Sequence, residues 1–496
     1  MPVSRRWAAG LATVCLVVSG CASTSIVDGL GARAPLPVTG GACQSDGEQS
    51  PQCVFDKSVQ NALSDVIAFW EVEYPKIANG AALPPLSGGL YSVDGASVQA
   101  GDPLPDDVKK EGCLAQQPKF VVDNGAYCRV DDSIVWDRSP NHLFNQLREK
   151  YGDMTVGLIF AHEFGHAVSQ RLHVFDKDLP VIDTESQADC AAGAWAAYVL
   201  AGKAPHFQNM RPQLDQALEG FLDGRDQTPG QGQSISHGNG FDRLSAIADG
   251  IKNGASFCYS PTYFNRSFTE RPYARTEDQQ SQGNQSLAQV LNPAVPKADG
   301  TGGGGGLQPD LNRFWRKAAP RVHKTWKDVQ IAEAAHVPCE SGDVEFGYCP
   351  DTNTVYYNQD FASSAYYSLP AVSVDPSTGD VQVLSNQPAD LALGTLFIVG
   401  WGLAVRHQLF GDAMDGKQAL LSAVCYAGVY AKDVNIASDP SQTRYILLSP
   451  PDMDEATSAM LDLVGSSKAF GSRGTSGLDR VQAFVKGYNG TDLSVC

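Results

Sequence analysis

The sequence lacks an excess of basic residues, and it lacks any apolar run long enough to suggest a permanent membrane span. Aspartate and glutamate number 55 against 37 lysines and arginines, which gives a net charge of −18. Nucleic acids and anionic lipid surfaces are bound by basic patches, so we expect no nucleic-acid partner. The apolar stretches Trp7–Val18 and Leu391–Val405 are shorter than the roughly 20 residues that a transmembrane helix needs.

The composition also lacks the features of a disordered chain. Apolar residues make up 43% of the sequence and charged residues 19%, which is typical of folded globular proteins. A chain of 496 residues is too long for one ordinary hydrophobic core, so we expect two domains.

The first residues have the pattern of an export signal. Arg5 and Arg6 precede an apolar stretch that ends in Val18-Ser19-Gly20-Cys21. Small residues directly before a cysteine resemble a bacterial lipobox, which predicts a signal peptide over 1–20 and a lipid-modified Cys21. An ordinary signal peptide with an incidental Cys21 is the alternative. We expect a protein that is lipid-anchored to the extracytoplasmic face of the cell membrane, with a flexible Gly/Pro/Ser-rich tether over 21–54.

The chain contains an internal repeat. The segment Gly157–Leu172 aligns with Gly394–Leu409, and further blocks of cysteine, glycine and aromatic residues recur in the same order. This pattern predicts a tandem duplication. We expect one copy over 55–270, a Gly/Gln/Ser-rich linker over 271–307 and a second copy over 308–496, with the two copies packed against each other.

Cysteine usage agrees with export. Twelve cysteines less Cys15 and Cys21 leave an even number, and disulfides are the default outside the cytoplasm. Equivalent cysteines of the two copies should form equivalent bonds, and the two cysteines without counterparts then pair by exclusion. The predicted pairs are Cys43–Cys53, Cys113–Cys128, Cys190–Cys258, Cys339–Cys349 and Cys425–Cys496. The alternative is that some of these are free buried thiols.

The first copy contains an H-E-F-G-H motif formed by His162, Glu163 and His166. Residues Met154–Leu172 have the composition and length of a helix, on which histidines four residues apart project from one face. Two imidazoles at this spacing can bind one Zn²⁺, and Glu163 can reach a water on that ion as a general base. The alternative is two ordinary surface or core histidines.

A second predicted helix, Glu185–Ala201, offers the third ligand. Asp183 and Thr184 are a plausible helix start. Glu185 is the expected ligand, because a catalytic zinc site has three protein ligands and one open position. Asp189, one turn later, is expected to accept a hydrogen bond from a ligand imidazole. Asp189 is also the alternative third ligand.

Together these motifs resemble those of the bacterial neutral zinc metallopeptidases, and the E-x-x-x-D segment after H-E-x-x-H resembles the gluzincin pattern. The matching segments are Tyr127-Cys128, His162–His166, Glu185–Trp195 and His237-Gly238 with Arg243. The resemblance covers the whole first copy, and with the lipobox it extends to mycobacterial lipoprotein peptidases. The sequence departs from the family pattern at Ala167, where the family often has a histidine, which puts the substrate preference in doubt.

The resemblance implies that His237 stabilises the oxyanion of the reaction, with a structural role as the alternative. Arg243 recurs as Arg480 in the second copy and is expected to be a shared structural residue. Three further histidines of the first copy show no spacing pattern and are expected at the surface: His142, His173 and His206.

The second copy is expected to fold but not to bind zinc. The residues aligned with His162, Glu163, His166, Glu185, Asp189 and His237 are Val399, Gly400, Leu403, Leu420, Val424 and Arg473. The apolar run Leu391–Val405 is then the buried former active-site helix. Each copy is expected to be an α+β, zincin-like domain, with a small sheet near 119–136 or 344–357 over two long core helices.

These features predict a metallopeptidase that hydrolyses a protein or peptide, with Zn²⁺ as its cofactor and Glu163 as the general base. One alternative is a zinc amidase that acts on cell-wall peptide. The other is a binding or assembly lipoprotein of the cell envelope, whose zinc is structural or vestigial. The intact Glu163 argues against the last, because a structural zinc site needs no base.

Overall fold

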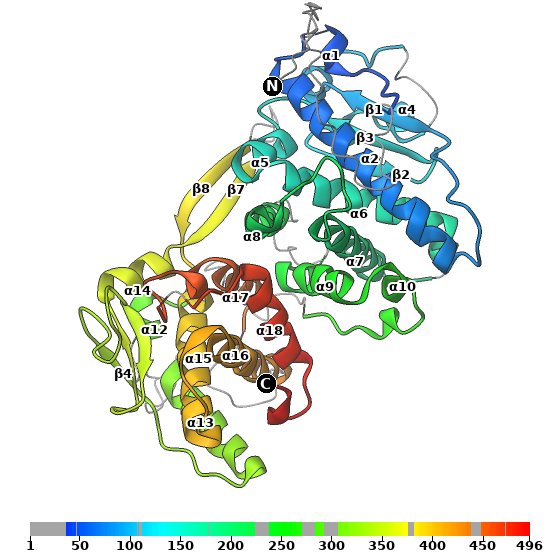
Figure 1. Cartoon of the computed structure of the whole chain (residues 1–496). Coiled ribbons are helices and arrows are strands. Elements are labelled where there is room, and N and C mark those ends of the chain that lie inside the picture. The colour runs from blue at the N-terminus through cyan, green and yellow to red at the C-terminus, as the bar shows by residue number, and fades with distance from the viewer. Residues whose placement is uncertain are drawn as a thin grey trace, which may run out of the picture. The chain divides into compact units, whose positions relative to one another are not determined.

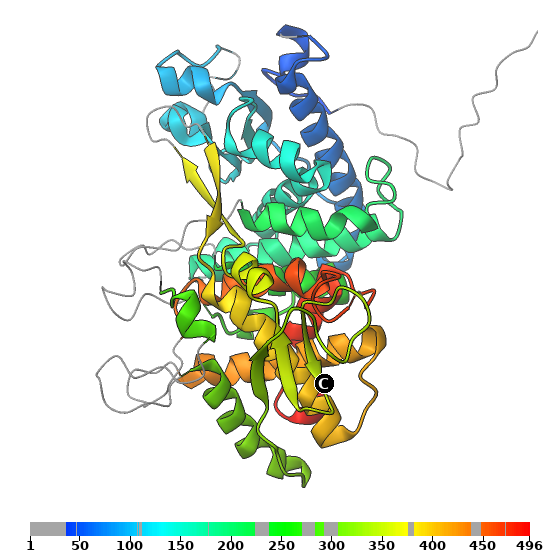
Figure 2. The ribbon, with the colours of Figure 1, turned by 90° about the vertical axis from the view of Figure 1, so that its left-hand side faces the viewer.

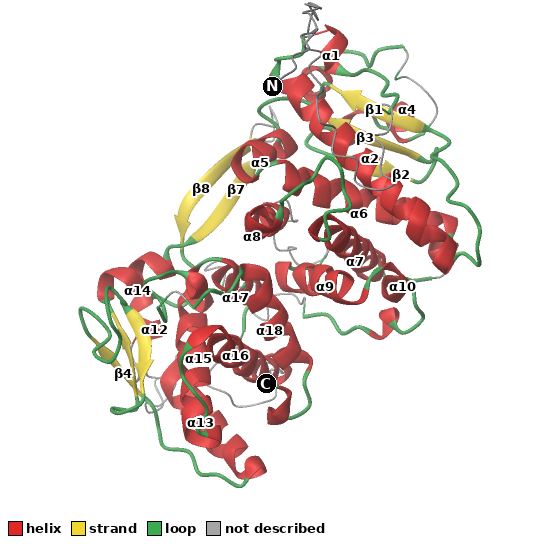
Figure 3. Ribbon diagram, viewed as in Figure 1, coloured by secondary structure: helices red, strands yellow, loops and turns green. Residues whose placement is uncertain are grey.

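Helices make up most of the described chain, and small sheets lie beside them (Figure 3), so the fold belongs to the expected α+β class. The computed structural model describes residues 36–45, 47–106, 108, 112–176, 178–223, 238–269, 283–291, 306–374, 381–437, 448–471 and 473–496. The predicted signal peptide, the lipidation site Cys21 and the candidate residue His237 lie outside the described residues.

The first half begins with the long helix α2 (Pro51–Ile77). The Ser50 side chain caps this helix by accepting a hydrogen bond of 3.1 Å from the backbone amide of Cys53. Pro51 stands in the first turn, where a missing N–H costs nothing. The face of α2 that carries Trp70 is fully buried against the core.

The sheet of the first half consists of β1 (Gly89–Val93), β2 (Gly125–Cys128) and β3 (Ser133–Asp137). β3 is central and runs parallel to β1 and antiparallel to β2. β2 is therefore an edge strand, and it lies against helix α6. The sequence predicted strands only in the 119–136 region. β1 was missed because its pairing with β3 is distant in sequence and leaves no local signal.

Two helices form the centre of this half: α6 (Asp153–Arg171) and α7 (Val181–Leu200). Both agree with the predicted helices to within a few residues at the ends. They lie against each other, and α8 (Leu214–Asp223) covers α6. Most residues of α6 and α7 are buried, so the two helices that carry the motif residues are held rigidly.

The second half has a sheet of the same design. Its strands are β4 (Gln330–Glu333), β5 (Phe346–Cys349) and β6 (Thr354–Tyr357). The central strand β6 runs parallel to β4 and antiparallel to β5. This is the repetition that a tandem duplication predicts, although the duplication itself stays a prediction.

Helices α15 (Asp390–Val405) and α16 (Gly416–Ala437) lie against each other in the second half (Figure 1). α15 corresponds to the predicted apolar segment, and nearly all of its residues are buried. Among the described residues, no helix combines the length and the hydropathy that crossing a membrane requires.

In each half, a later helix crosses the second core helix at very short distance. α9 (Gly240–Asn253) crosses α7, where a Cβ atom at Gly250 would lie 1.9 Å from the carbonyl oxygen of Cys190. α18 (Gly477–Asn489) crosses α16, where a Cβ atom at Gly487 would lie 1.8 Å from the carbonyl oxygen of Cys425. Only glycine permits such an approach.

The remaining elements connect these cores. In the first half they are α1 (Ala42–Ser45), α3 (Gly95–Ala100), α4 (Cys113–Gln116), α5 (Leu143–Tyr151) and α10 (Ala255–Cys258), and in the second half α13 (Leu307–Ala318), α14 (Gln359–Tyr366) and α17 (Asp452–Leu461). The 3-10 turns are Pro118–Val121, Val174–Asp176, Arg211–Gln213, Tyr263–Asn265, Ala319–Val322, Leu463–Gly465 and Leu493–Val495, and a π-helical turn spans Arg406–Phe410.

Two elements were not expected from the sequence. The hairpin of β7 (Leu369–Val374) and β8 (Val381–Gln387) has no counterpart in the first half, so the repeat did not predict it. The hairpin projects from the second half (Figure 2), and β7 contacts α8 of the first. The short helix α12 (Leu287–Leu291) lies within the predicted linker, where three apolar side chains pack on the core.

The structure contains all five predicted disulfides. They join Cys43 to Cys53, Cys113 to Cys128, Cys190 to Cys258, Cys339 to Cys349 and Cys425 to Cys496. The last pair of each half ties matching elements, since Cys190–Cys258 joins α7 to α10 and Cys425–Cys496 joins α16 to the end of the chain. The repeat was therefore a sound guide to the pairing.

The two halves contact each other through helix N-termini. The backbone amide of Gly240, at the start of α9, donates to Asp454 of α17. In the reverse direction, Asp215 of α8 accepts from the backbone amide of Gly477 at the start of α18. Carboxylates are favoured at these positions by the partial positive charge of a helix N-terminus. Each half thus caps a helix of the other.

Candidate metal centre

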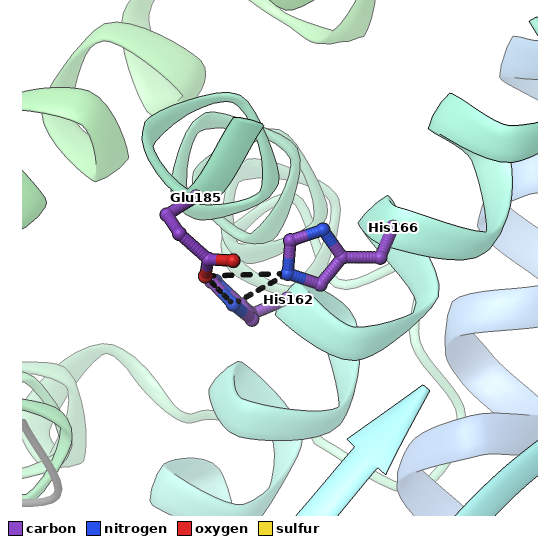
Figure 4. Close-up of side chains that lie close together, drawn as sticks. All are labelled: His162, His166 and Glu185. Carbon is purple, nitrogen blue, oxygen red and sulfur yellow. Dashed lines mark hydrogen bonds and ion pairs between the residues drawn. The ribbon is translucent and has the colours of Figure 1, made fainter. Parts of the chain in front are cut away.

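The two histidines of the motif lie one turn apart on α6, and Glu185 reaches them from the early part of α7 (Figure 4). The Nε2 atoms of His162 and His166 are 3.1 Å apart. Oε2 of Glu185 is 3.2 Å from the first and 3.3 Å from the second. The structure therefore brings the three predicted ligand groups to one point.

The spacing of these three atoms agrees with that around a zinc ion. Ligand atoms about 2.0–2.1 Å from a tetrahedral zinc are separated by roughly 3.3 Å from one another. The observed separations are 3.1–3.3 Å. Among the described residues, no fourth histidine, cysteine, aspartate or glutamate joins this group.

The orientation of His162 also favours a cation at this point. Its Nδ1 atom is 2.7 Å from Oδ1 of Asp189, so the neutral ring carries its proton on Nδ1 and directs the Nε2 lone pair at Glu185. Two acceptors that face each other repel unless a cation or a proton lies between them. Two imidazole nitrogens and a carboxylate oxygen are a donor set that zinc favours.

Arg243 of α9 forms two hydrogen bonds with the carboxylate of Asp189. Its Nε atom is 3.1 Å from Oδ2 and its Nη2 atom 3.0 Å from Oδ1. Asp189 is fully buried, and burial raises its pKa, but Arg243 and His162 together hold that pKa below its usual value. The carboxylate thus orients His162 and lies outside the ligand group, which does not support the alternative of Asp189 as third ligand.

The charges around the ligand group favour a positive species. Burial alone lowers the pKa of His162, but the carboxylates of Asp189 and Glu185 outweigh burial and raise it to about 10. Burial raises the pKa of Glu185, yet the two histidines hold it well below its usual range. A divalent cation at this point would take the place of the proton and pair with the same carboxylates.

Glu163 is held beside the ligand group and not within it. The backbone amide of Tyr127 in the edge strand β2 donates a hydrogen bond of 2.8 Å to its Oε2 atom. The other carboxylate oxygen, Oε1, lies 4.0 Å from Nε2 of His162. One oxygen is therefore anchored to the sheet, and the other is placed near the point at which the ligands converge.

One phenylalanine ring lies beside each of the two histidines. The ring of Phe221 is 6.2 Å from that of His162, and the ring of Phe175 is 6.2 Å from that of His166. Arg129 lies over Phe175 at 3.8 Å.

The structure revises two expectations for the first copy. Arg243 touches Asp189 directly, so its part in the site was underrated; its place in the H-G-x-x-x-x-R segment was the available signal. His142 is buried rather than on the surface, because its Nδ1 atom is hydrogen-bonded to Asp137. Asp137 also accepts from the amides of Gly95 and Ser139 at 2.9 Å, so this pair is a structural anchor.

The aligned positions of the second half carry no ligand group. Val399, Leu403, Leu420 and Val424 are buried in an apolar core. A Cβ atom at Gly400, opposite Glu163, would lie 2.9 Å from the Val355 side chain, which fills that space. Arg480, the counterpart of Arg243, instead donates to the backbone carbonyls of Met460 and Leu461.

Comparison with known proteins gives sequence relatives without a described function. No family model matches the chain, and no solved structure matches it. Two relatives from Escherichia coli, each named uncharacterized protein YpfJ, come from strain K12 and from strain O6:H1. Each is 26% identical over 181 residues, an alignment that spans 29% of this chain and 62% of the relative. The chain thus spans less than two thirds of the length of the curated proteins to which it is similar.

Proposed function

We propose that the protein is a zinc-dependent peptidase of the bacterial neutral zinc metallopeptidase type, anchored by lipid at Cys21 on the extracytoplasmic face of the membrane. One observation carries the proposal. His162, His166 and Glu185 present three ligand atoms 3.1–3.3 Å apart, with the Glu163 carboxylate beside them. A purely structural zinc site has no use for that fourth group.

The proposed cofactor is Zn²⁺, with His162, His166 and Glu185 as its ligands. Zn²⁺ held there would lower the pKa of a water and polarise the scissile carbonyl of a peptide. Glu163 acts as the general base: its Oε1 takes the proton of the water and delivers it to the leaving amine. The amide of Tyr127 keeps Oε2 of the same carboxylate fixed, so Glu163 needs little reorganisation during the proton transfer.

Asp189 and Arg243 position the ligands and take no part in the chemistry. Asp189 fixes the tautomer of His162 through Nδ1, and Arg243 fixes Asp189 with two hydrogen bonds. Such supporting groups maintain metal affinity and ligand orientation. His237 lies outside the described residues, and the oxyanion role that the resemblance implies for it is part of the proposal.

The disulfides support the proposed compartment. Five disulfides in one chain are typical of proteins outside the reducing cytoplasm. The second half, with Val399, Gly400 and Leu403 at the motif positions, is proposed to be a non-catalytic partner of the first. The substrate is a protein or peptide.

The test compares the purified protein with its Glu163→Gln variant. Zinc is measured by mass spectrometry, and cleavage is profiled on a mixed peptide library and on cell-wall peptide. We expect equal zinc in both proteins and peptide cleavage by the unsubstituted protein only. Cleavage confined to cell-wall peptide would identify an amidase, and zinc without any cleavage would favour a binding lipoprotein. Either result would overturn the peptidase proposal.

A further inference from the structure

A second group of potential metal ligands lies in the second half. Asp390 is the first residue of α15, and Asp452 and Glu455 lie in the first turn of α17. Each of the three carboxylates offers one oxygen, and these oxygens lie within 4.8 Å of one another. The group is far removed in sequence from the motif residues and contains no histidine or cysteine.

Asp452 and Glu455 are buried and Asp390 is partly buried, and one oxygen each of Asp390 and Glu455 has no hydrogen-bond partner among the described residues. Glu455 is 0% exposed and Asp452 5%. The backbone amide of Leu391 donates to Oε2 of Glu455 at 2.7 Å, and that of Gln285 donates to Oδ2 of Asp390 at 2.8 Å. The other oxygens, Oε1 of Glu455 and Oδ1 of Asp390, are shielded from solvent and have no hydrogen-bond partner among the described residues.

An arrangement of this kind is costly without a positive charge. Within the described part of the chain, neither Asp390 nor Glu455 forms an ion pair with lysine, arginine or histidine. Burial, reinforced by the neighbouring carboxylates, raises the pKa of Glu455 well above its usual range, and burial raises that of Asp390 to about 6. Buried carboxylates are normally paired with a cation or a metal ion.

The corresponding position of the first half, where α8 covers α6, has no such group of three carboxylates among the described residues. Asp153 is the first residue of α6, as Asp390 is of α15, and it accepts a hydrogen bond of 2.9 Å from Arg148. Helix α8 covers α6 as α17 covers α15. The equivalent contacts of Asp215 and Asp454 with the other half align α8 with α17, so Gln213 and Gln216 stand where the second half has Asp452 and Glu455. The acidic group is therefore specific to the second half.

We propose that Asp390, Asp452 and Glu455 bind a hard divalent cation, of which Ca²⁺ is the best match. Calcium takes carboxylate and carbonyl oxygens at about 2.3–2.6 Å, so oxygens on opposite sides of one ion are separated by about 5 Å. The oxygens of the group lie within 4.8 Å of one another, which is close enough for all three to reach one ion. An all-oxygen ligand set suits calcium rather than zinc. The ion would join α15 to α17, independently of the peptidase proposal.

The test is a direct measurement of calcium binding by the full-length protein after treatment with EDTA. Calcium is titrated by isothermal calorimetry, and Tb³⁺ luminescence reports on the same group. Tyr366 serves as the sensitiser because it lies close to the group. Its hydroxyl donates to the backbone carbonyl of Gln285 at 2.5 Å, and the backbone amide of the same residue donates to Asp390. We expect one calcium per chain, and Tb³⁺ emission that calcium displaces.

Three variants locate the bound ion. Asp390→Asn and Glu455→Gln preserve side-chain shape and should each weaken calcium binding more than about 10-fold, since each removes one charged ligand from a three-carboxylate set. Asp153→Asn is the matched control and should bind calcium as the unsubstituted protein does. If a variant fails to fold, the Tb³⁺ emission of the unsubstituted protein still shows whether the acidic group beside Tyr366 binds a cation.

Two results would overturn the proposal. One is no calcium binding up to about 10 mM, beyond the range of weak extracellular calcium modules; the carboxylates would then share protons instead. The other is calcium binding that Asp390→Asn and Glu455→Gln leave unchanged, which would place the ion elsewhere.

Discussion

The backbone amide of Tyr127 donates a hydrogen bond of 2.8 Å to Oε2 of Glu163. This bond joins the edge strand β2 to the helix that carries the two histidines. It fixes one oxygen of the carboxylate and leaves Oε1, 4.0 Å from Nε2 of His162, directed toward the ligand group. The sheet therefore positions the proposed base, although it supplies no ligand.

Replacement of Glu163 by glutamine should abolish turnover and leave zinc bound. The glutamine carbonyl can still accept from the Tyr127 amide, but the side chain can no longer take a proton at neutral pH. General bases contribute about 10²–10⁴-fold to rate, and we expect a loss of kcat in that range. The measurements are kcat on a cleaved peptide and zinc per chain. A Glu163→Gln or Glu163→Ala protein with near-normal kcat would refute the mechanism.

Replacement of Glu185 and replacement of Asp189 should affect zinc binding differently. Glu185→Ala removes a ligand and should lower zinc stoichiometry markedly. Asp189→Asn leaves the ligand set complete but disturbs the His162 tautomer, so zinc affinity should fall by about 10–100-fold. Both effects are measured by competition with a chromophoric chelator. Full zinc retention by Glu185→Ala would mean that the third ligand is another residue.

Arg243 and Arg480 form a matched pair for a test of the supporting role. Arg243→Met leaves the charge of Asp189 buried without its partner, which should lower the free energy of unfolding by about 3–5 kcal/mol and weaken zinc binding. Arg480→Met should lower stability as well, because Arg480 holds the carbonyls of Met460 and Leu461. It should not change zinc affinity. Equal effects of the two substitutions on zinc affinity would contradict the positioning role.

Removal of zinc should destabilise the first half. An ion that binds only the native state adds roughly 4 kcal/mol of stability at a free concentration 1,000 times its Kd. Scanning calorimetry before and after chelation should show the unfolding temperature fall and then recover when zinc is returned. The His166→Ala protein should show no such response. Indifference of the unsubstituted protein to chelation would argue against the site.

The Asp137–His142 pair should make stability depend on pH in the acid range. Burial raises the pKa of Asp137, but its hydrogen bonds from His142 and Ser139 outweigh burial and hold it below the usual value. A depressed carboxyl pKa contributes stability above about pH 4 that is lost as the pH falls through the folded-state value. Asp137→Asn should therefore be less stable at pH 7 and should show a shallower loss below pH 4. Urea unfolding at several pH values measures both.

Much of the first-half site could be predicted from the sequence because its signals are local. The spacing of His162 and His166 fixes them on one helical face, and Glu185 and Asp189 share a second helix with the same spacing. The structure brings these four residues together as predicted. The disulfides were predictable for a different reason, since the two halves supply the same pattern twice.

What the sequence did not indicate depends on contacts between distant segments. The hydrogen bond from Tyr127 to Glu163 requires β2 to lie at a sheet edge, and that edge exists only because β1 pairs on the far side of β3. The histidine at 142 looked like a surface residue because nothing nearby shows that Asp137 is aimed at it. The acidic group of the second half joins residues from helices α15 and α17, which no local pattern connects.

The contact between Gly240 and Asp454 has a consequence for any shortened form of this protein. Gly240 begins the helix that carries Arg243, and the carboxylate at its amide belongs to the other half. Cutting away the second half would leave that helix with a frayed first turn, three residues from the guanidinium on which Asp189 depends. The second half, which lacks the motif residues at the aligned positions, would no longer support this helix, and we expect a truncated protein to bind zinc more weakly than the full chain.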